Sequence, residues 1–192
     1  MAEFIIDITG TSALLMHNAR LADPLDPITK EKAKVSSKRK KTEEDQELLS
    51  HLEWQGGLYW HDAVGPYLPG DNVFKSLIEA ARKSKDGKRV EQGLLITTDQ
   101  NPLVYDGPRT LDGLWEDKRF VHRCTVKQQM SRIVRTRPIF HSWRTQVEGR
   151  FDDSVLNAED VESFAEIAGK YIGVGDWRPK HGRFDVKVEV SR

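Results

Sequence analysis

Cysteine is almost absent from this chain of 192 residues, because Cys124 is the only one. A single cysteine excludes an internal disulfide and a cysteine-rich metal site, and it fits a reducing compartment such as the cytoplasm. Net charge is lacking as well, since 30 Lys and Arg residues balance 30 Asp and Glu residues. The total charge therefore predicts neither an acidic nor a basic partner, and only the distribution of charges along the chain is informative.

Long hydrophobic runs are also missing. The first residues, MAEFIIDITGTSALLMHN, contain a short apolar run that Glu3, Asp7 and Gly10 interrupt, and no basic segment precedes it. We therefore expect neither a signal peptide nor a membrane span in this sequence. The expected protein is cytoplasmic and has no membrane partner.

The signatures of common enzymes are absent: there is no G-x-S-x-G, no P-loop lysine, no H-E-x-x-H and no cysteine pair for a metal. We predict no metal site and no cofactor. Six histidines leave room for acid–base cleavage of RNA, which needs an imidazole near a 2′-hydroxyl and a cation. His17, His141 and His181 are the candidates for that role, but scattered histidines are usually structural. The sequence favours a protein that is not an enzyme.

Hydrophobic periodicity predicts the order of the main elements. Residues 4–9 and 184–190 alternate as strands do, whereas residues 71–84 and 157–172 have helical spacing, with Asp71 or Asn72 and Asn157 as helix caps. Residues 119–149 predict a long hairpin. This order fits a βαββαβ core of the ferredoxin-like or RRM-like type, in which both helices cover one face of an antiparallel sheet. We predict a single α+β domain over residues 1–192.

Two stretches interrupt this core. Hydrophobic content collapses between Ala22 and Glu47, so we predict an insertion over residues 20–66 that contains a flexible basic arm at about residues 28–47. Such an arm can clamp a phosphate backbone and become ordered on binding. Residues 85–118 mix turn signals with isolated apolar residues and are predicted to be irregular. The arm residues predicted to contact nucleic acid are Lys38, Arg39, Lys40 and Lys41.

A strong charge asymmetry marks the predicted hairpin. From Lys118 to Val147 there are eight basic residues and no acidic one, and most of the bases are arginines, which favour bidentate contact with phosphate. Phe120, Phe140 and Trp143 interleave with them, as a platform for stacked bases requires. The alternative is a solvated strand face. The residues predicted to contact nucleic acid here are Arg123, Lys127, Arg132, Arg135, Arg137, Trp143 and Arg144.

A glycine-rich loop, GVGDWRPKHGR, precedes the last strand. Its glycines permit close approach of a backbone, and Arg178, Lys180 and Arg183 add positive charge. Trp177 either stacks on a base or plugs the core beneath the last strand, and burial is the commoner fate of a large aromatic residue. A simple helix cap and turn is the alternative for the whole loop.

Three segments together resemble the RAMP superfamily, the CRISPR-associated RNA-binding proteins. PYLPGDNVFKSLIEAAR resembles the start of the family's first helix, FIIDITGTSALLMHN its first strand, and GVGDWRPKHGRFDV its glycine-rich loop. The resemblance implies a ferredoxin-like fold, self-association along RNA, and CRISPR-like or phage protein partners. The loop departs from the family at DWRPKHG, where small residues and arginine are more usual. The ending GDWRPKHGRF is also similar to that of compact phage and prophage proteins.

We therefore predict a non-catalytic protein that binds single-stranded nucleic acid, with RNA favoured over DNA, and that forms homo-oligomers. Two alternatives remain open. One is a RAMP-type endoribonuclease that uses a histidine, and the other is a phage protein that binds another protein through an exposed sheet. Retention of intact RNA in chelator separates binding from cleavage.

Overall fold

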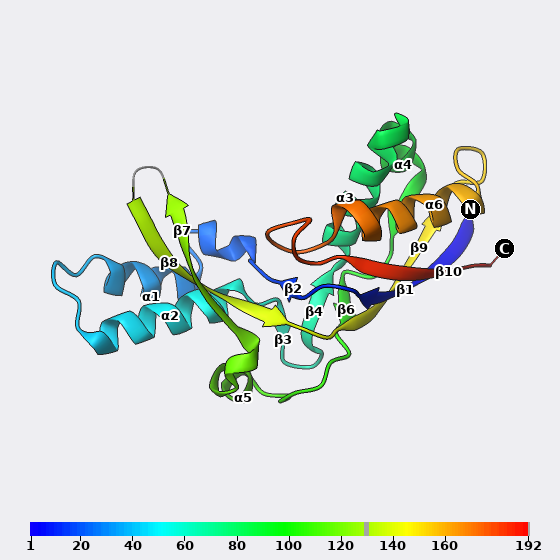
Figure 1. Cartoon of the computed structure of the whole chain (residues 1–192). Coiled ribbons are helices and arrows are strands. Elements are labelled where there is room, and N and C mark those ends of the chain that lie inside the picture. Colours follow the sequence, from blue (N-terminus) through cyan, green and yellow to red (C-terminus); the bar gives the residue numbers. More distant parts are fainter. Residues whose placement is uncertain (129–130, 192) are drawn as a thin grey trace. The chain divides into compact units, whose positions relative to one another are not determined.

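The computed structural model describes residues 1–128 and 131–191, and in it the chain forms two compact units. Both units contain helices and antiparallel strands (Figure 1), so the α+β class with antiparallel sheets is confirmed. The second unit draws on most of the predicted insertion and on a later stretch of the chain. The first unit combines Met1–Leu14, Trp60–Asp106 and His141–Arg192, and the second combines Leu15–Tyr59 and Gly107–Phe140.

The main sheet of the first unit is centred on β1 (Ala2–Gly10). This strand pairs antiparallel with β10 (Phe184–Ser191) on one side and with β9 (Arg144–Phe151) on the other. The short β5 (Leu94–Ile96) pairs with the outer edge of β9 and completes the order β10-β1-β9-β5. The predicted first and last strands are therefore confirmed.

One face of this sheet is covered by two helices, α3 (Gly70–Ala81) and α6 (Ala158–Ile167), which lie on the same side of it (Figure 1). Phe4, Ile6 and Ile8 of β1 are each 1% exposed, because alternate side chains of a strand share one face. The intervening residues of β1 are exposed or half-buried. The sheet thus has a buried apolar face and an open face.

The two helices begin differently. The side chain of Asn157 accepts a hydrogen bond from the N–H of Asp160, whose carboxylate accepts one from the N–H of Asn157, so the predicted cap of α6 is confirmed. At α3 the N-cap position is Pro69, which offers no side-chain hydrogen bond. The prediction that Asp71 or Asn72 caps this helix is therefore wrong. Asp71 instead lies in the first turn, where its negative charge interacts favourably with the helix dipole.

The remaining elements of the first unit are short. A small sheet has the order β3-β4-β6, and residues 85–118, predicted to be irregular, contain short regular elements of both units. Elements of two to seven residues are too short to produce a clear hydrophobic period. Those of the first unit are β3 (Trp60–His61), β4 (Gly65–Pro69), η2 (Arg82–Ser84), α4 (Gly87–Gly93), β6 (Gln100–Pro102) and the π-helical turn η4 (Ala168–Ile172), and α5 (Leu111–Glu116) belongs to the second unit.

In the second unit, two helices occupy much of the stretch predicted to be a flexible arm. α1 (Pro27–Ser36) begins at Asp26, whose carboxylate accepts hydrogen bonds from two backbone N–H groups of the first turn at 2.9 and 3.1 Å. α2 (Glu43–Gly57) begins with a capping box formed by Thr42 and Asp45. The prediction of a flexible arm is therefore wrong. These residues form a helix, a short connection and the start of a second helix.

The strands of the second unit form the predicted hairpin. β7 (Val121–Gln128) pairs antiparallel with β8 (Ser131–Phe140), and Gln129 and Met130 lie outside the described residues. β8 also pairs with β2 (Leu14–Leu15), where the chain enters this unit, giving the order β2-β8-β7. The hairpin was predicted to extend over residues 119–149, but its second strand ends at Phe140. The chain then continues as β9 of the first unit.

An aromatic core holds the base of this hairpin to α2. Trp54 is 1% exposed, and its Nε1 donates a hydrogen bond of 2.9 Å to the carbonyl of Phe120. The rings of Phe120 and Phe140 meet edge to face with their centroids 5.5 Å apart. Two 3-10 turns complete the unit, η1 (Ala19–Ala22) and η3 (Lys118–Phe120).

Candidate nucleic-acid interface

Three basic side chains share one face of the β7–β8 hairpin. Lys127 lies directly opposite Arg132 in the register, and Arg123 lies four residues before Lys127 on the same strand. Paired residues of antiparallel strands, and alternate residues of one strand, project from the same face. All three are exposed, and within residues 1–128 and 131–191 none of them forms an ion pair with a carboxylate. We call this set, Arg123, Lys127 and Arg132, the cationic face.

The other two predicted arginines of the hairpin are half-buried. Arg135 donates a hydrogen bond of 2.7 Å from Nη1 to Oε1 of Glu53, while Oε2 of Glu53 accepts the backbone N–H of Thr136 at 3.1 Å. Glu53 therefore covers the open edge of β8 and neutralises Arg135. Arg137 lies opposite His122 on the face that Arg135 shares. The structure thus separates a structural arginine, Arg135, from the cationic face.

The predicted aromatic platform is wrong. Phe120, Phe140 and Trp143 are 5%, 1% and 1% exposed, respectively, so none of them offers a ring to a base. The indole Nε1 of Trp143 donates a hydrogen bond of 2.9 Å to the carbonyl of Ser12, and its ring meets that of Phe184 at 6.4 Å. The spacing of aromatics among arginines does not reveal which way each side chain points, and here the rings turn inward.

Arg144 lies on the open face of the main sheet, at the start of β9. This face carries both signs of charge, and its side chains bond to each other: Glu3 pairs with Arg150 at 2.7 Å, and Gln146 donates to Asp7 at 2.8 Å. A face of paired, mixed charges with exposed carboxylates attracts a phosphate backbone poorly. The structure therefore sets Arg144 apart from the cationic face of the hairpin.

The glycine-rich loop depends on residues with positive φ. Gly173, Gly175 and Gly182 have φ values of 78°, 79° and 74°. A Cβ atom on Gly182 would lie 1.8 Å from the carbonyl oxygen of Val174, so only glycine fits there. Trp177 adopts a left-handed φ of 58°, which is unusual for a large residue. The loop is therefore a specific backbone shape rather than a loose connection.

Trp177 is 43% exposed, so its predicted role as a plug of the core is wrong. Its ring stacks on His181 with centroids 5.8 Å apart, and Nζ of Lys180 lies 5.0 Å from its centroid. Two neighbouring arginines serve the loop itself. Arg178 contacts Glu79 at 3.3 Å, and Nε of Arg183 donates to the carbonyl of Pro179 at 2.8 Å. Among the predicted contact residues of this loop, Trp177 and Lys180 are thus the ones that offer a surface for stacking.

Tyr171 is a surface aromatic that the sequence places on the buried face of the second helix. It is 49% exposed and lines a groove of about 450 Å³ with Trp177 and Arg178. Nζ of Lys83 lies 4.6 Å from the Tyr171 ring centroid, and Nζ of Lys170 lies 5.4 Å from it. The turn η4 explains the difference, because a π-helical turn adds a residue and shifts the helical register.

The basic cluster of the predicted arm occupies the connection between α1 and α2. All four of its residues are exposed, yet two have internal partners: Nζ of Lys38 donates to Asp45 at 2.6 Å, and Nζ of Lys41 donates to the carbonyl of Lys38 at 3.0 Å. The hydrogen bond from Lys38 lowers the pKa of Asp45. Arg39 and Lys40 are therefore the arm residues that remain available to a phosphate.

The three candidate histidines are divided between the two units. His17 belongs to the second unit, and His141 and His181 belong to the first. Burial and the nearby Lys180 lower the pKa of His181, which keeps its imidazole neutral near pH 7. His141 of the same unit also contributes to the lowered pKa of His181.

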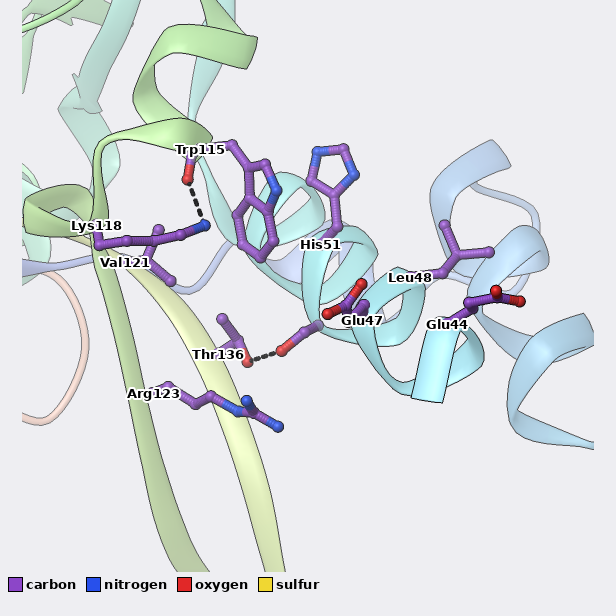
Figure 2. Close-up of a pocket in the computed structure, with 10 residues that line it drawn as sticks. Glu44, Glu47, Leu48, His51, Trp115, Lys118, Val121, Arg123 and Thr136 are labelled. Carbon is purple, nitrogen blue, oxygen red and sulfur yellow. Dashed lines mark hydrogen bonds between the residues drawn. The ribbon is translucent and has the colours of Figure 1, made fainter. Parts of the chain in front are cut away.

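A cleft of about 610 Å³ lies between α2, α5 and the base of the hairpin within the second unit (Figure 2). His51 and Trp115 form an aromatic wall with their ring centroids 4.7 Å apart, and Nζ of Lys118 lies 4.3 Å from the centroid of Trp115. Arg123 of the cationic face also lines this cleft. The pairing of His51 with Trp115 is not visible in the sequence, because the two residues lie 64 positions apart and share no local pattern.

Acidification should destabilise the second unit through His51. Burial, helped by the charge of Lys118, lowers the pKa of His51 from its ordinary 6.5. The unfolded chain then binds the proton more readily than the folded one. Stability from this group is complete above pH 6.5 and declines as the pH falls through the lower folded pKa. On acidification from about pH 7.5 to 5.5, we expect the Tm of His51→Gln to fall less than that of the wild type. An equal fall in Tm would contradict the role of His51 in this pH dependence.

No protein-family model matches the chain, and no curated protein matches it either. Across the described ranges 1–128 and 131–191, no three His, Cys, Asp or Glu side chains are grouped to hold a metal ion. Within the same ranges, no helix combines the length and the apolar character that crossing a bilayer requires. Functional inference therefore rests on the geometry described above.

Proposed function

We propose that the protein binds single-stranded nucleic acid, with RNA favoured over DNA, through the cationic face of the β7–β8 hairpin. The supporting observation is the direct pairing of Lys127 with Arg132, in line with Arg123 and, among the residues that the structure describes, without an ion pair to a carboxylate. Like charges placed directly opposite each other destabilise a hairpin. A phosphate backbone that lies along the face removes this repulsion and releases its counterions.

The hairpin suits an extended anionic ligand better than a compact one. An isolated two-stranded ribbon is marginally stable in water, and the outer part of this hairpin has exposed residues on one face, including Val134 at 50%. A bound strand would cover Val134 and contact the basic residues on both sides of it. Trp177 and Lys180 offer a second surface, in the first unit, on which a base can stack.

The proposed fold of the first unit is a ferredoxin-like βαββαβ core, and the proposed family is the RAMP superfamily. The strand order β10-β1-β9-β5 supports this, with α3 between β1 and β5 in the chain and α6 between β9 and β10. The glycine-rich loop with its required positive φ values, directly before β10, supports the family resemblance. Self-association along RNA, and phage or CRISPR-like protein partners, belong to the same proposal.

The test is retention of labelled RNA. The protein is incubated with a fluorescent single-stranded RNA in chelator, and the mixture is resolved on a native gel and then on a denaturing gel. We expect a shifted band on the native gel and full-length RNA on the denaturing gel. RNA that the wild type shortens, but that stays full-length with a His17→Ala, His141→Ala or His181→Ala variant, would support the endoribonuclease instead. The absence of any shift at low salt would overturn the proposal.

A further inference from the structure

The cleft between α2, α5 and the hairpin has the size of a small-ligand site, since its volume of about 610 Å³ falls within the usual range for such pockets. Its walls differ in chemistry. One wall is aromatic and carries His51 and Trp115, with their rings inclined by 32°. The lining also includes a hydroxyl pair, because the Oγ of Ser50 and the Oγ1 of Thr136 are 2.6 Å apart.

Opposite charges line this cleft without touching each other. Lys118 and Arg123 supply the positive side, and Glu44 and Glu47 of α2 supply the negative side. In the part of the chain that the structure describes, no ion pair joins the two sides. Nζ of Lys118 is held above the ring of Trp115 by a hydrogen bond of 3.0 Å to that residue's carbonyl (Figure 2). The cleft therefore presents a positioned cation beside an aromatic surface, and two carboxylates also belong to its lining.

These features select among ligand classes. A simple anion would meet the two carboxylates, and a neutral sugar would leave the two cations without a partner. A nucleotide satisfies every wall: its phosphate suits Lys118 and Arg123, its base packs on the aromatic wall, and its ribose hydroxyls donate to a carboxylate. Arg123 also belongs to the cationic face, so a strand lying on that face reaches the cleft without a break.

We infer that this cleft is a ribonucleotide pocket, in which Lys118 and Arg123 hold the phosphate and Glu47 accepts a hydrogen bond from the 2′-hydroxyl. The inference rests on the proposed function and adds a cause for the preference for RNA, because the 2′-hydroxyl distinguishes RNA from DNA. The same chemistry fits a nucleotide within a bound strand and a free mononucleotide.

The experiment titrates the full-length protein with adenosine 5′-monophosphate, its 2′-deoxy analogue and inorganic phosphate by isothermal calorimetry. We expect the ribonucleotide to bind best and inorganic phosphate to bind worst. Lys118→Met should weaken ribonucleotide binding about tenfold, since a charge-assisted hydrogen bond is lost. Glu47→Gln should abolish the preference over the deoxy analogue. Both side chains are exposed, so these variants are expected to fold, as thermal unfolding can verify.

Glu43→Gln is the matched control, because Glu43 is an exposed acid of α2 that does not line the cleft. It should bind all three ligands as the wild type does. Equal affinity for the ribonucleotide and inorganic phosphate, or a Lys118→Met variant with wild-type affinity, would overturn the pocket. If the pocket receives a nucleotide of a strand, Lys118→Met also weakens binding of a single-stranded RNA. If RNA binding needs the cationic face but neither Lys118 nor Glu47, the pocket does not receive a nucleotide of the bound RNA, and the proposed function remains intact.

Discussion

Replacing Glu53 with alanine is expected to lower the free energy of unfolding of the second unit by about 2–3 kcal/mol, because it leaves the buried N–H of Thr136 and the half-buried Arg135 without their acceptor. Glu53 is 6% exposed and joins three elements. It accepts hydrogen bonds from Nζ of Lys32 on α1 at 3.3 Å, from Arg135 at 2.7 Å and from the backbone N–H of Thr136 at 3.1 Å. Thermal and denaturant unfolding followed by circular dichroism measure the change.

Glu44→Ala is the control for this prediction, since Glu44 is an exposed acid of the same helix without an ion pair in the described residues. It should change the free energy of unfolding by no more than about 0.5 kcal/mol. Glu53→Gln, which can still accept hydrogen bonds, should fall between the two. A Glu53→Ala protein as stable as Glu44→Ala would contradict the role of Glu53 as the link between α1, α2 and β8.

Replacing Trp143 with alanine is expected to cost about 3–5 kcal/mol of stability in the first unit, the usual cost of emptying a large buried aromatic site. The ring lies against Gly10, where a Cβ atom would come within 2.2 Å of the indole Nε1. Its hydrogen bond to the carbonyl of Ser12 would also be lost. Loss of soluble protein and a lower Tm are the expected observations.

Trp177→Ala is the matched control for Trp143, because both tryptophans belong to the first unit and Trp177 is 43% exposed. This change should alter stability by no more than about 0.5 kcal/mol. If the two substitutions destabilise equally, the assignment of Trp143 to the core and of Trp177 to the surface is incorrect.

The strongly patterned elements could be predicted from the sequence. Phe4, Ile6 and Ile8 recur at every second position of β1 and are buried, and the Asn157 cap of α6 lies where the sequence indicates. The hairpin of β7 and β8 also follows from its β-branched and alternating residues. In each case the local pattern and the tertiary environment favour the same structure.

α1 could not be predicted because its pattern is weak. It buries only Val35 among its ten residues, so its composition resembles that of a disordered arm. Its helix is fixed instead by the Asp26 cap, by Pro27 at the first helical position and by packing on α2. Tertiary contact supplies what helical propensity lacks.

The candidate site was predicted in part for a similar reason. The excess of bases between Lys118 and Val147 is a property of the sequence, but the side chain of Arg135 turns to Glu53, a residue 82 positions away. The cleft of His51 and Trp115 likewise joins α2 to α5. Contacts between distant segments leave no periodic signal, so neither the neutralised arginine nor the cleft is visible in the sequence alone.

The salt dependence of RNA binding tests the cationic face most directly. Fluorescence anisotropy gives the affinity for a labelled single-stranded RNA at several salt concentrations, for the wild type, for Lys127→Ala/Arg132→Ala and for the control Lys88→Ala/Lys187→Ala. The control removes the same charge from exposed positions of the first unit. We predict weaker binding by the hairpin variant, with a slope of log affinity against log salt that is shallower by about 1.4, since each phosphate contact on a single strand contributes about 0.7. A hairpin variant with the affinity and slope of the wild type would contradict the account.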